Sequence, residues 1–143
     1  MNSSDSPPPV ELWDRFEEFE QELQYAACLA LMSASEALLR TDYAVRVYER
    51  KKDSLSRSMR DLYNKNGLKV SLSNDLLELW GTQFPECKAV IGNYRGAIKF
   101  RDWRAHGRWW VPKIGKKYLL QDIFDIADQL FQKLPEIEED WVT

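Results

Sequence analysis

The sequence predicts an all-α fold, a bundle of four long helices plus one short helix. Apolar residues recur at intervals of three and four along most of the chain, which is typical of amphipathic helices. Gly and Pro number only six each among 143 residues, too few for a fold with many tight strand turns. The length corresponds to one domain.

The first two helices follow a Pro-rich start. Residues 1–9 are polar and are expected to be a disordered lead. A helix is predicted from residue 10 to about 39. The apolar residues of one of its faces are Leu12, Phe16, Phe19, Leu23, Ala26 and Ala30. Thr41 or Asp42 is then expected to cap a second helix over about 43–66, with Asn66-Gly67 as its stop signal.

Three more helices complete the predicted bundle. A short helix should begin at Ser73 or Asn74 and continue to about Trp80, closed by Gly81. A fourth helix is predicted over about 86–105, where Gly92 and Gly96 would let another helix approach closely. The last helix is predicted over 120–134, with Phe124 among its apolar residues.

The regions outside these helices differ in character. Residues 108–117 are predicted to form a basic loop or short hairpin, because Trp, Val, Pro and Gly occur there together. The helical domain is therefore expected over 10–135, and 136–143 form an acidic C-terminal tail.

Charge is distributed unevenly along the chain. Residues 88–117 hold nine basic residues and one acidic residue, whereas the whole chain has a net charge of −3. A basic segment in an acidic chain is typical of a surface that binds a polyanion, although a solvated helix face has the same composition.

Several function classes are excluded by composition. Cys28 and Cys87 are too few for a disulfide framework and are expected to be buried thiols. One His and two distant Cys do not form a usual zinc site, and no metal or other cofactor is expected. No segment resembles a signal peptide or a membrane span, so we expect a cytoplasmic protein with no membrane partner.

The segment from Arg101 to His106 is the candidate site. His106 is the only side chain whose ordinary pKa lies near neutrality, which suits it to proton transfer. Asp102 stands four residues earlier, on the same helix face, and can fix the imidazole tautomer. The guanidinium of Arg101 suits phosphate oxygens, but five residues on an ideal helix do not align it with His106, so the helix is expected to end near His106.

The spacing Arg101-x4-His106 at the end of the penultimate long helix resembles the HEPN superfamily, with Asp102 as the polar residue that often follows the Arg. The resemblance implies a metal-independent endoribonuclease, often a toxin of a toxin–antitoxin or phage-defence system. It also implies a homodimer whose two copies of Arg101 and His106 share one cleft, and a possible antitoxin partner. In some of these toxins a Tyr two residues after the His accepts AMP; here that residue is Arg108.

RNA would also need to be held in place. Three basic side chains can contact phosphates: Arg104, Arg108 and Lys113. Trp109 offers an aromatic ring on which a base can stack. Two alternatives remain open from the sequence. One is a non-catalytic helical module that binds RNA or a protein, and the other is a structural bundle whose Trp residues form a dimer interface.

Overall fold

The computed structural model describes residues 10–106, 119–135 and 137, without the side chains of 10 and 103–106. Within this part the protein has five α-helices and no strand, which confirms the all-α class. The helices are α1 (Val10–Tyr48), α2 (Ser54–Asn66), α3 (Leu77–Gln83), α4 (Lys88–His106) and α5 (Leu120–Lys133). A π-helical turn, η2 (Leu72–Leu76), and a 3-10 turn, η3 (Pro85–Cys87), precede α3 and α4.

The first helix is longer than predicted. We expected a break near Thr41 or Asp42, but α1 continues through both to Tyr48. Asp42 is not a cap. Its carboxylate accepts a hydrogen bond from Arg46 Nε at 2.9 Å, and both side chains are buried inside the helical stretch. The cap of α2 is Asp53, which accepts from the backbone N–H of Ser56 at 3.1 Å.

The predicted stop at Gly67 is confirmed. Gly67 follows α2 with φ of 61°, a conformation that favours glycine, and its N–H bonds to the Tyr63 carbonyl. The next helical segment begins at Leu72, after Ser71 as the cap, rather than at Ser73 or Asn74. It also continues through Gly81, which is buried against the side chain of Ile91.

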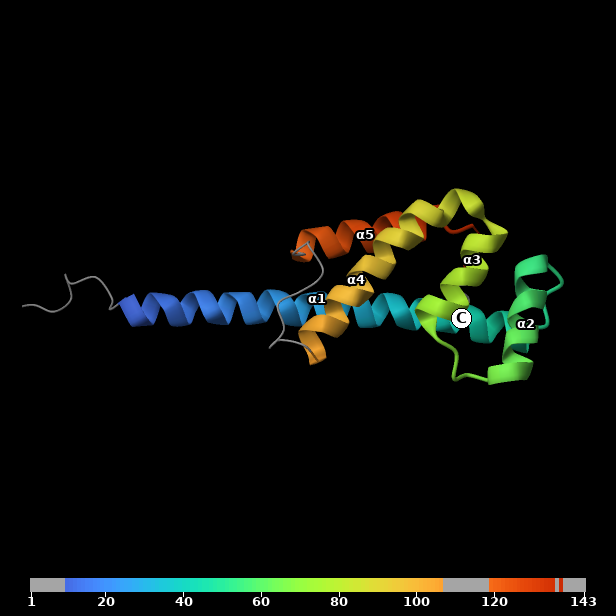
Figure 1. Cartoon of the computed structure of the whole chain (residues 1–143), viewed down its shortest axis with the longest axis horizontal. Coiled ribbons are helices and arrows are strands. Elements are labelled where there is room, and N and C mark those ends of the chain that lie inside the picture. The colour runs from blue at the N-terminus through green and yellow to red at the C-terminus, as the bar shows by residue number, and fades with distance from the viewer. Residues whose placement is uncertain (1–9, 107–118, 136, 138–143) are drawn as a thin grey trace, which may run out of the picture.

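The core lies on one side of α1, where α4 and α5 cover its middle and α2 and α3 cover its C-terminal part (Figure 1). Its fully buried large side chains come from all five helices and from η2: Met32, Leu39, Tyr43, Met59, Leu76, Leu77, Trp80, Ile91, Tyr94, Ile123 and Leu130. Cys28 and Cys87 are buried free thiols, as predicted. Phe124, counted among the apolar positions of α5, is instead about half exposed. Gly92 also differs, because a Cβ there would meet nothing within 4 Å.

The N-terminal part of α1 extends beyond the other helices (Figure 1). The predicted apolar face of Leu12, Phe16, Phe19 and Leu23 is exposed there. Leu12 and Cys28 are sixteen residues apart, which corresponds to a rotation of about 160° around an α-helix. The buried positions from Cys28 onward therefore lie on the opposite face of α1 from the predicted apolar stripe.

Among the described residues, no helix combines the length and the apolar composition that a membrane span requires. The predicted lead over 1–9 and the predicted loop or hairpin over 108–117 lie outside the described residues. Of the predicted tail, only Ile137 is described.

Candidate functional site

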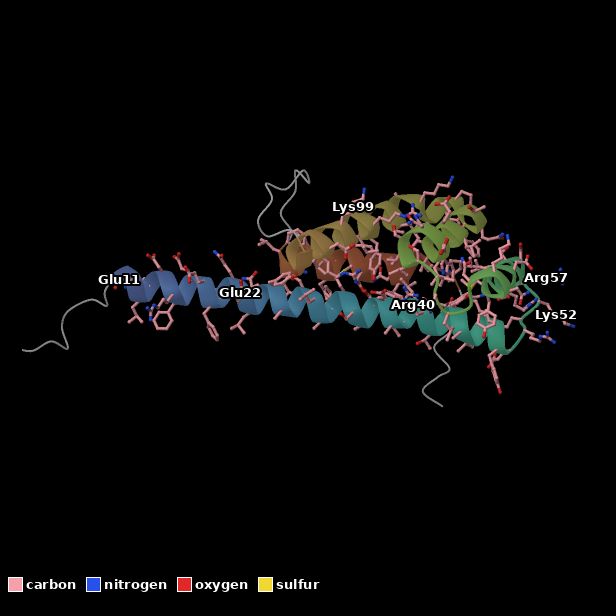
Figure 2. All side chains as sticks on the ribbon, turned by 60° about the horizontal axis from the view of Figure 1, so that its bottom comes forward. Glu11, Glu22, Arg40, Lys52, Arg57 and Lys99 are labelled. Carbon is pink, nitrogen blue, oxygen red and sulfur yellow. The ribbon has the colours of Figure 1, made fainter. Side chains whose placement is uncertain are left out.

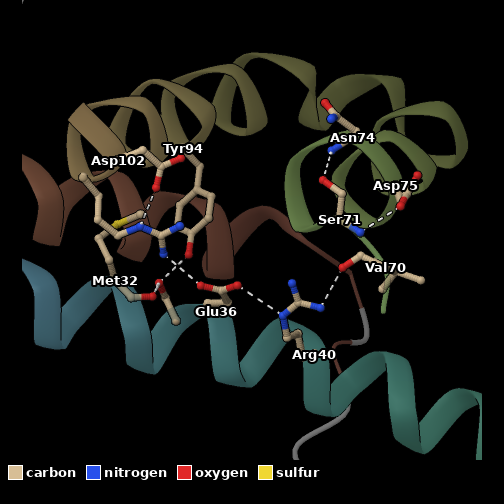
Figure 3. A network of polar contacts seen from close by, with 11 residues as sticks. Met32, Glu36, Arg40, Val70, Ser71, Asn74, Asp75, Tyr94 and Asp102 are labelled. Carbon is tan, nitrogen blue, oxygen red and sulfur yellow. Dashed lines mark hydrogen bonds and ion pairs between the residues drawn. The ribbon is translucent and has the colours of Figure 1, made fainter. Parts of the chain in front are cut away.

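Arg101 is anchored between two helices. Its Nη1 donates to Glu36 Oε2 on α1 at 2.8 Å, and its Nε donates to the neighbouring Asp102 at 3.2 Å (Figure 3). The Arg101 side chain is 22% exposed, and that of Glu36 is 25% exposed. The last described turns of α4 are thus tied to the middle of α1 by a charged hydrogen bond at the edge of the core.

Glu36 serves two arginines at once. Its other carboxylate oxygen accepts from Arg40 Nε one helical turn later, at 3.1 Å. Arg40 in turn donates from Nη1 to the Val70 carbonyl at 2.9 Å, in the segment that leads into η2 (Figure 3). One carboxylate therefore links α4, α1 and the start of the η2–α3 unit.

A second polar contact lies beside this ion pair. Ser35, which precedes Glu36, shares a hydrogen bond with the Tyr94 hydroxyl and donates another to the Met32 carbonyl. Tyr94 is fully buried on α4, two turns before Arg101. The Ser35–Tyr94 pair fixes how α4 crosses α1, and so fixes where Arg101 lies.

The electrostatics of the cluster are balanced. Burial by itself raises the pKa of Glu36, but the hydrogen bonds from Arg101 and Arg40 outweigh it and hold that pKa below its usual value. Burial would likewise lower the pKa of Arg101, yet Glu36 and Asp102 raise it. The Arg101 cluster consists of Arg101, Arg40, Glu36 and Asp102. Its two guanidinium groups and two carboxylates leave no net charge, so attraction for an anion must come from other basic residues.

The predicted site residues are described to different degrees. Arg101 and Asp102 lie together on α4, and Asp102 contacts Arg101 rather than any other described side chain. His106 is the last residue of α4, and Arg104 is also in this helix, but the side chains of both lie outside the described part. Arg108, Trp109 and Lys113 lie wholly outside it. The structure thus gives the backbone position of His106 and the side-chain contacts of Arg101 and Asp102.

Glu36 is the residue that sequence reasoning missed. A signal for it exists, because Glu36 is the one acidic residue between Glu22 and Asp42. Its one basic neighbour in that stretch is Arg40, and a carboxylate at the edge of a core also favours a cationic partner from another helix. The position of the partner, 65 residues later, is not encoded in any local pattern.

The described side chains include no group of three or more His, Cys, Asp or Glu residues placed to hold a metal ion. The fold and the cluster define an all-helical protein with a carboxylate-anchored arginine near the end of its penultimate long helix. The chain matches no protein-family model, and comparisons with curated proteins and with solved structures find no similar chain.

Proposed function

We propose that this protein is a metal-independent endoribonuclease in which Arg101 and His106 act at the scissile phosphate. The observation that carries the proposal is the ion pair between Arg101 and Glu36 at 2.8 Å, which holds a guanidinium five residues before the only His of the chain. A guanidinium has five N–H donors. The bonds to Glu36 and Asp102 use two of them, so others remain for phosphate oxygens.

The proposed reaction is a transphosphorylation. The ribose 2′-oxygen attacks phosphorus while a base takes its proton, and the bond from phosphorus to the 5′-oxygen breaks as an acid protonates that oxygen. The products are a 2′,3′-cyclic phosphate and a 5′-hydroxyl end. Arg101 stabilises the charge that develops on the phosphoryl oxygens, and His106 transfers the proton.

One chain supplies one His, whereas the reaction needs both a base and an acid. We therefore propose that two copies share the site, so that each contributes His106 and Arg101. Asp102 would orient His106, in addition to the hydrogen bond that it accepts from Arg101. An isolated monomer is expected to be inactive.

We assign RNA binding to residues 99–117, the part of the basic segment around and beyond Arg101, since the Arg101 cluster itself is neutral. Lys99, exposed on α4, and Arg104, Arg108 and Lys113 would contact phosphates, and Trp109 would stack on an unpaired base. The cellular role that agrees with this activity is a toxin or phage-defence nuclease held in check by an antitoxin protein.

The test is RNA cleavage in the presence of EDTA by wild type, Arg101→Ala and His106→Ala. We expect each substitution to reduce the cleavage rate at least about 100-fold. The matched control is Arg95→Ala, because Arg95 is also on α4 and also pairs with a carboxylate, Glu78 at 2.9 Å. Cleavage that EDTA abolishes, or that His106→Ala leaves intact, contradicts the proposal.

The sharing of the site is tested with mixed subunits. A heterodimer of one wild-type and one His106→Ala subunit should lose most activity if the two imidazoles act as base and acid. Near-full activity of this heterodimer argues against shared roles.

A non-catalytic RNA-binding or protein-interaction module is the second candidate. The observation that favours it is the double pairing of Arg101, because a guanidinium held by two carboxylates also serves as a structural link between α4 and α1. RNA that binds at low salt without being cut supports this module.

A further inference from the structure

The exposed face of α1 continues along the entire helix. The large side chains Leu12, Phe16, Phe19 and Leu23 are followed at the same angular position by small or short ones. These are Ala26, Ala30, Ala34, Ala37, Thr41 and Ala44, and Tyr48 ends the row. All of them are exposed or partly exposed, on the side of α1 opposite the core. The face therefore has a large-residue half and a small-residue half.

We propose that this face binds the same face of a second copy, with the two α1 helices antiparallel. In that arrangement the large residues meet small ones: Leu12 lies opposite Ala44, Phe19 opposite Ala37, and Leu23 opposite Ala34, while Ala26 and Ala30 meet at the centre. Such alternation lets two helices interdigitate closely. A parallel arrangement would instead stack the aromatic residues of both copies and leave the alanines against each other.

Charge favours the same arrangement. Residues 11–22 carry six acidic residues and one basic residue. Residues 40–57 carry six basic residues and three acidic residues. Figure 2 shows Glu11 and Glu22 toward one end of the molecule and Lys52 and Arg57 at the other. Antiparallel helices place each acidic half beside the basic end of the partner, whereas parallel helices place the two acidic halves together.

A groove near the C-terminal end of α1 gives the start of the partner's large-residue half a place to bind. It has a volume of about 490 Å³, and Ala44 and Tyr48 of the exposed face form part of its wall together with Leu68 and Arg60. In the antiparallel register the N-terminal turns of the partner's α1 reach this groove. Its apolar wall suits Leu12. Its two guanidinium groups, of Arg50 and Arg60, outnumber its one carboxylate, of Asp61, and so suit the acidic residues beside Leu12.

The area available is that of a specific interface. Trp13 borders the face, with its ring 6.1 Å from that of Phe16. Trp13, Phe16 and Phe19 each expose more than half of their surface, which amounts to on the order of 100 Å² per side chain. The aromatic surface of two copies is then roughly 600 Å², and the leucines and the facing alanines raise the total toward about 1,000 Å², the lower bound for a stable contact. Monomers rarely leave such a patch uncovered.

The first test measures mass in solution by light scattering after size exclusion. Wild type should have twice the 16.8 kDa chain mass or a multiple of that value. The double variant Phe16→Ser, Phe19→Ser should weaken this association at least about 100-fold, while Phe124→Ser, at an equally exposed aromatic residue on α5, should leave it unchanged. A wild-type protein that is already monomeric at millimolar concentration, and stays so at each 100-fold dilution, overturns the proposal.

The second test fixes the direction by disulfide trapping. The double variant Leu12→Cys, Ala44→Cys should form a covalent dimer on oxidation. The two new cysteines of one chain cannot pair, being about 48 Å apart along one helix. Neither single variant should form a dimer, and the native thiols are buried. A disulfide formed by Leu12→Cys alone shows parallel helices and overturns the antiparallel arrangement.

This contact is independent of the proposed nuclease activity. The exposed face lies on the side of α1 away from α4, so it does not itself bring two Arg101 side chains together. A protein that uses both contacts associates beyond a dimer. A monomeric wild-type protein contradicts this contact and also the shared nuclease site, whereas a dimer that survives Phe16→Ser, Phe19→Ser contradicts this contact alone.

Discussion

Arg101 Nη1 lies 2.8 Å from Glu36 Oε2, and this contact joins residues 65 positions apart in the sequence. It connects α4 to α1 at the edge of the core, next to the buried hydrogen bond between Ser35 and Tyr94. The proposed catalytic arginine therefore belongs to the framework that positions α4 as well as to the candidate site. The two roles are separable, because removal of Glu36 changes the position of Arg101 without removing its charge.

Replacement of Glu36 by Gln tests this framework role. At pH 7 we expect the free energy of unfolding to fall by about 1 kcal/mol, a modest value because the pair is partly exposed. The pKa of Glu36 is lower in the folded protein than in the unfolded chain. Its stabilisation is therefore complete above the unfolded pKa and is lost as the pH falls through the folded one.

The measurement is urea denaturation of wild type and Glu36→Gln at pH 7 and at about pH 3, below the usual carboxyl pKa. The difference between the two proteins should shrink at the lower pH. Glu78→Gln is the matched control, since Glu78 pairs with Arg95 but its side chain is 66% exposed, and it should show a difference near zero at both pH values. A Glu36→Gln difference that does not depend on pH would falsify the ion-pair explanation.

The buried network around Arg46 predicts a much larger effect. Arg46 donates to Asp42, Asp53 and the Ser56 hydroxyl at 2.9–3.1 Å, and its guanidinium lies 5.3 Å from the centre of the Trp80 ring. Arg46→Met removes the cation and leaves the fully buried carboxylate of Asp42 behind. We expect a loss of about 3–5 kcal/mol in the free energy of unfolding.

Chemical denaturation at pH 7 measures this loss. Glu49→Ala is the control, because Glu49 and Lys51 form a partly exposed and long pair at 3.7 Å that should contribute little. A loss below about 1 kcal/mol for Arg46→Met would mean that Asp42 is compensated by other groups when the arginine is absent.

The same network explains why the sequence predicts some boundaries and not others. Gly67 sets a helix end through its own backbone conformation, which the Asn66-Gly67 pair signals locally. Asp is a residue type that commonly caps helices, so the local sequence predicts a helix cap at Asp42. Asp42 instead pairs with Arg46 inside α1, where α2 helps to bury the two side chains. This buried ion pair stabilises a helix that continues through Asp42 to Tyr48.

In the candidate site, too, the local sequence predicts some features, and others depend on contacts between helices. The spacing of Arg101, Asp102 and His106 on one helix is visible in the sequence, and the described part of α4 extends to His106, one residue beyond the predicted end at about 105. Glu36 and Tyr94 are not visible in that way, since their contacts join α1 to α4 only after the bundle has formed. The apolar stripe of α1 was readable as a helix face, but its periodicity does not say whether the face meets the core or solvent.

Two glycines predict opposite changes for the same substitution. Gly67 has φ of 61° and a Cβ there would meet nothing within 4 Å, so Gly67→Ala is opposed only by the backbone conformation. We expect it to lower the free energy of unfolding by about 1–2 kcal/mol. Gly92 lies in α4, also with open space around it, and Gly92→Ala should raise stability by about 0.5–1 kcal/mol because Ala favours helix. Thermal denaturation of both variants measures the two signs, and a gain for Gly67→Ala would contradict the positive φ.

Tyr94 predicts a loss of stability at high pH. Burial raises the pKa of Tyr94 to about 12, although the hydrogen bond with Ser35 opposes this shift. The unfolded chain ionises its tyrosines near pH 10. The neutral phenol therefore stabilises the fold fully below pH 10, and this contribution is lost as the pH rises from about 10 to about 12. Over that range the loss amounts to about 2–3 kcal/mol.

Tyr94→Phe isolates this contribution, because Phe cannot ionise. At pH 8 the variant should be less stable than wild type by about 1 kcal/mol, since it lacks the hydrogen bond to Ser35. Above pH 10 wild type alone loses the Tyr94 contribution, so the two stabilities should cross, and above the crossing the variant should be the more stable protein. Guanidinium denaturation between pH 8 and pH 11.5 measures the crossing. Tyr48→Phe, at a side chain that is 88% exposed, should show no such change. A constant difference between wild type and Tyr94→Phe across this range would mean that the Tyr94 phenol titrates in the folded protein as it does in the unfolded chain.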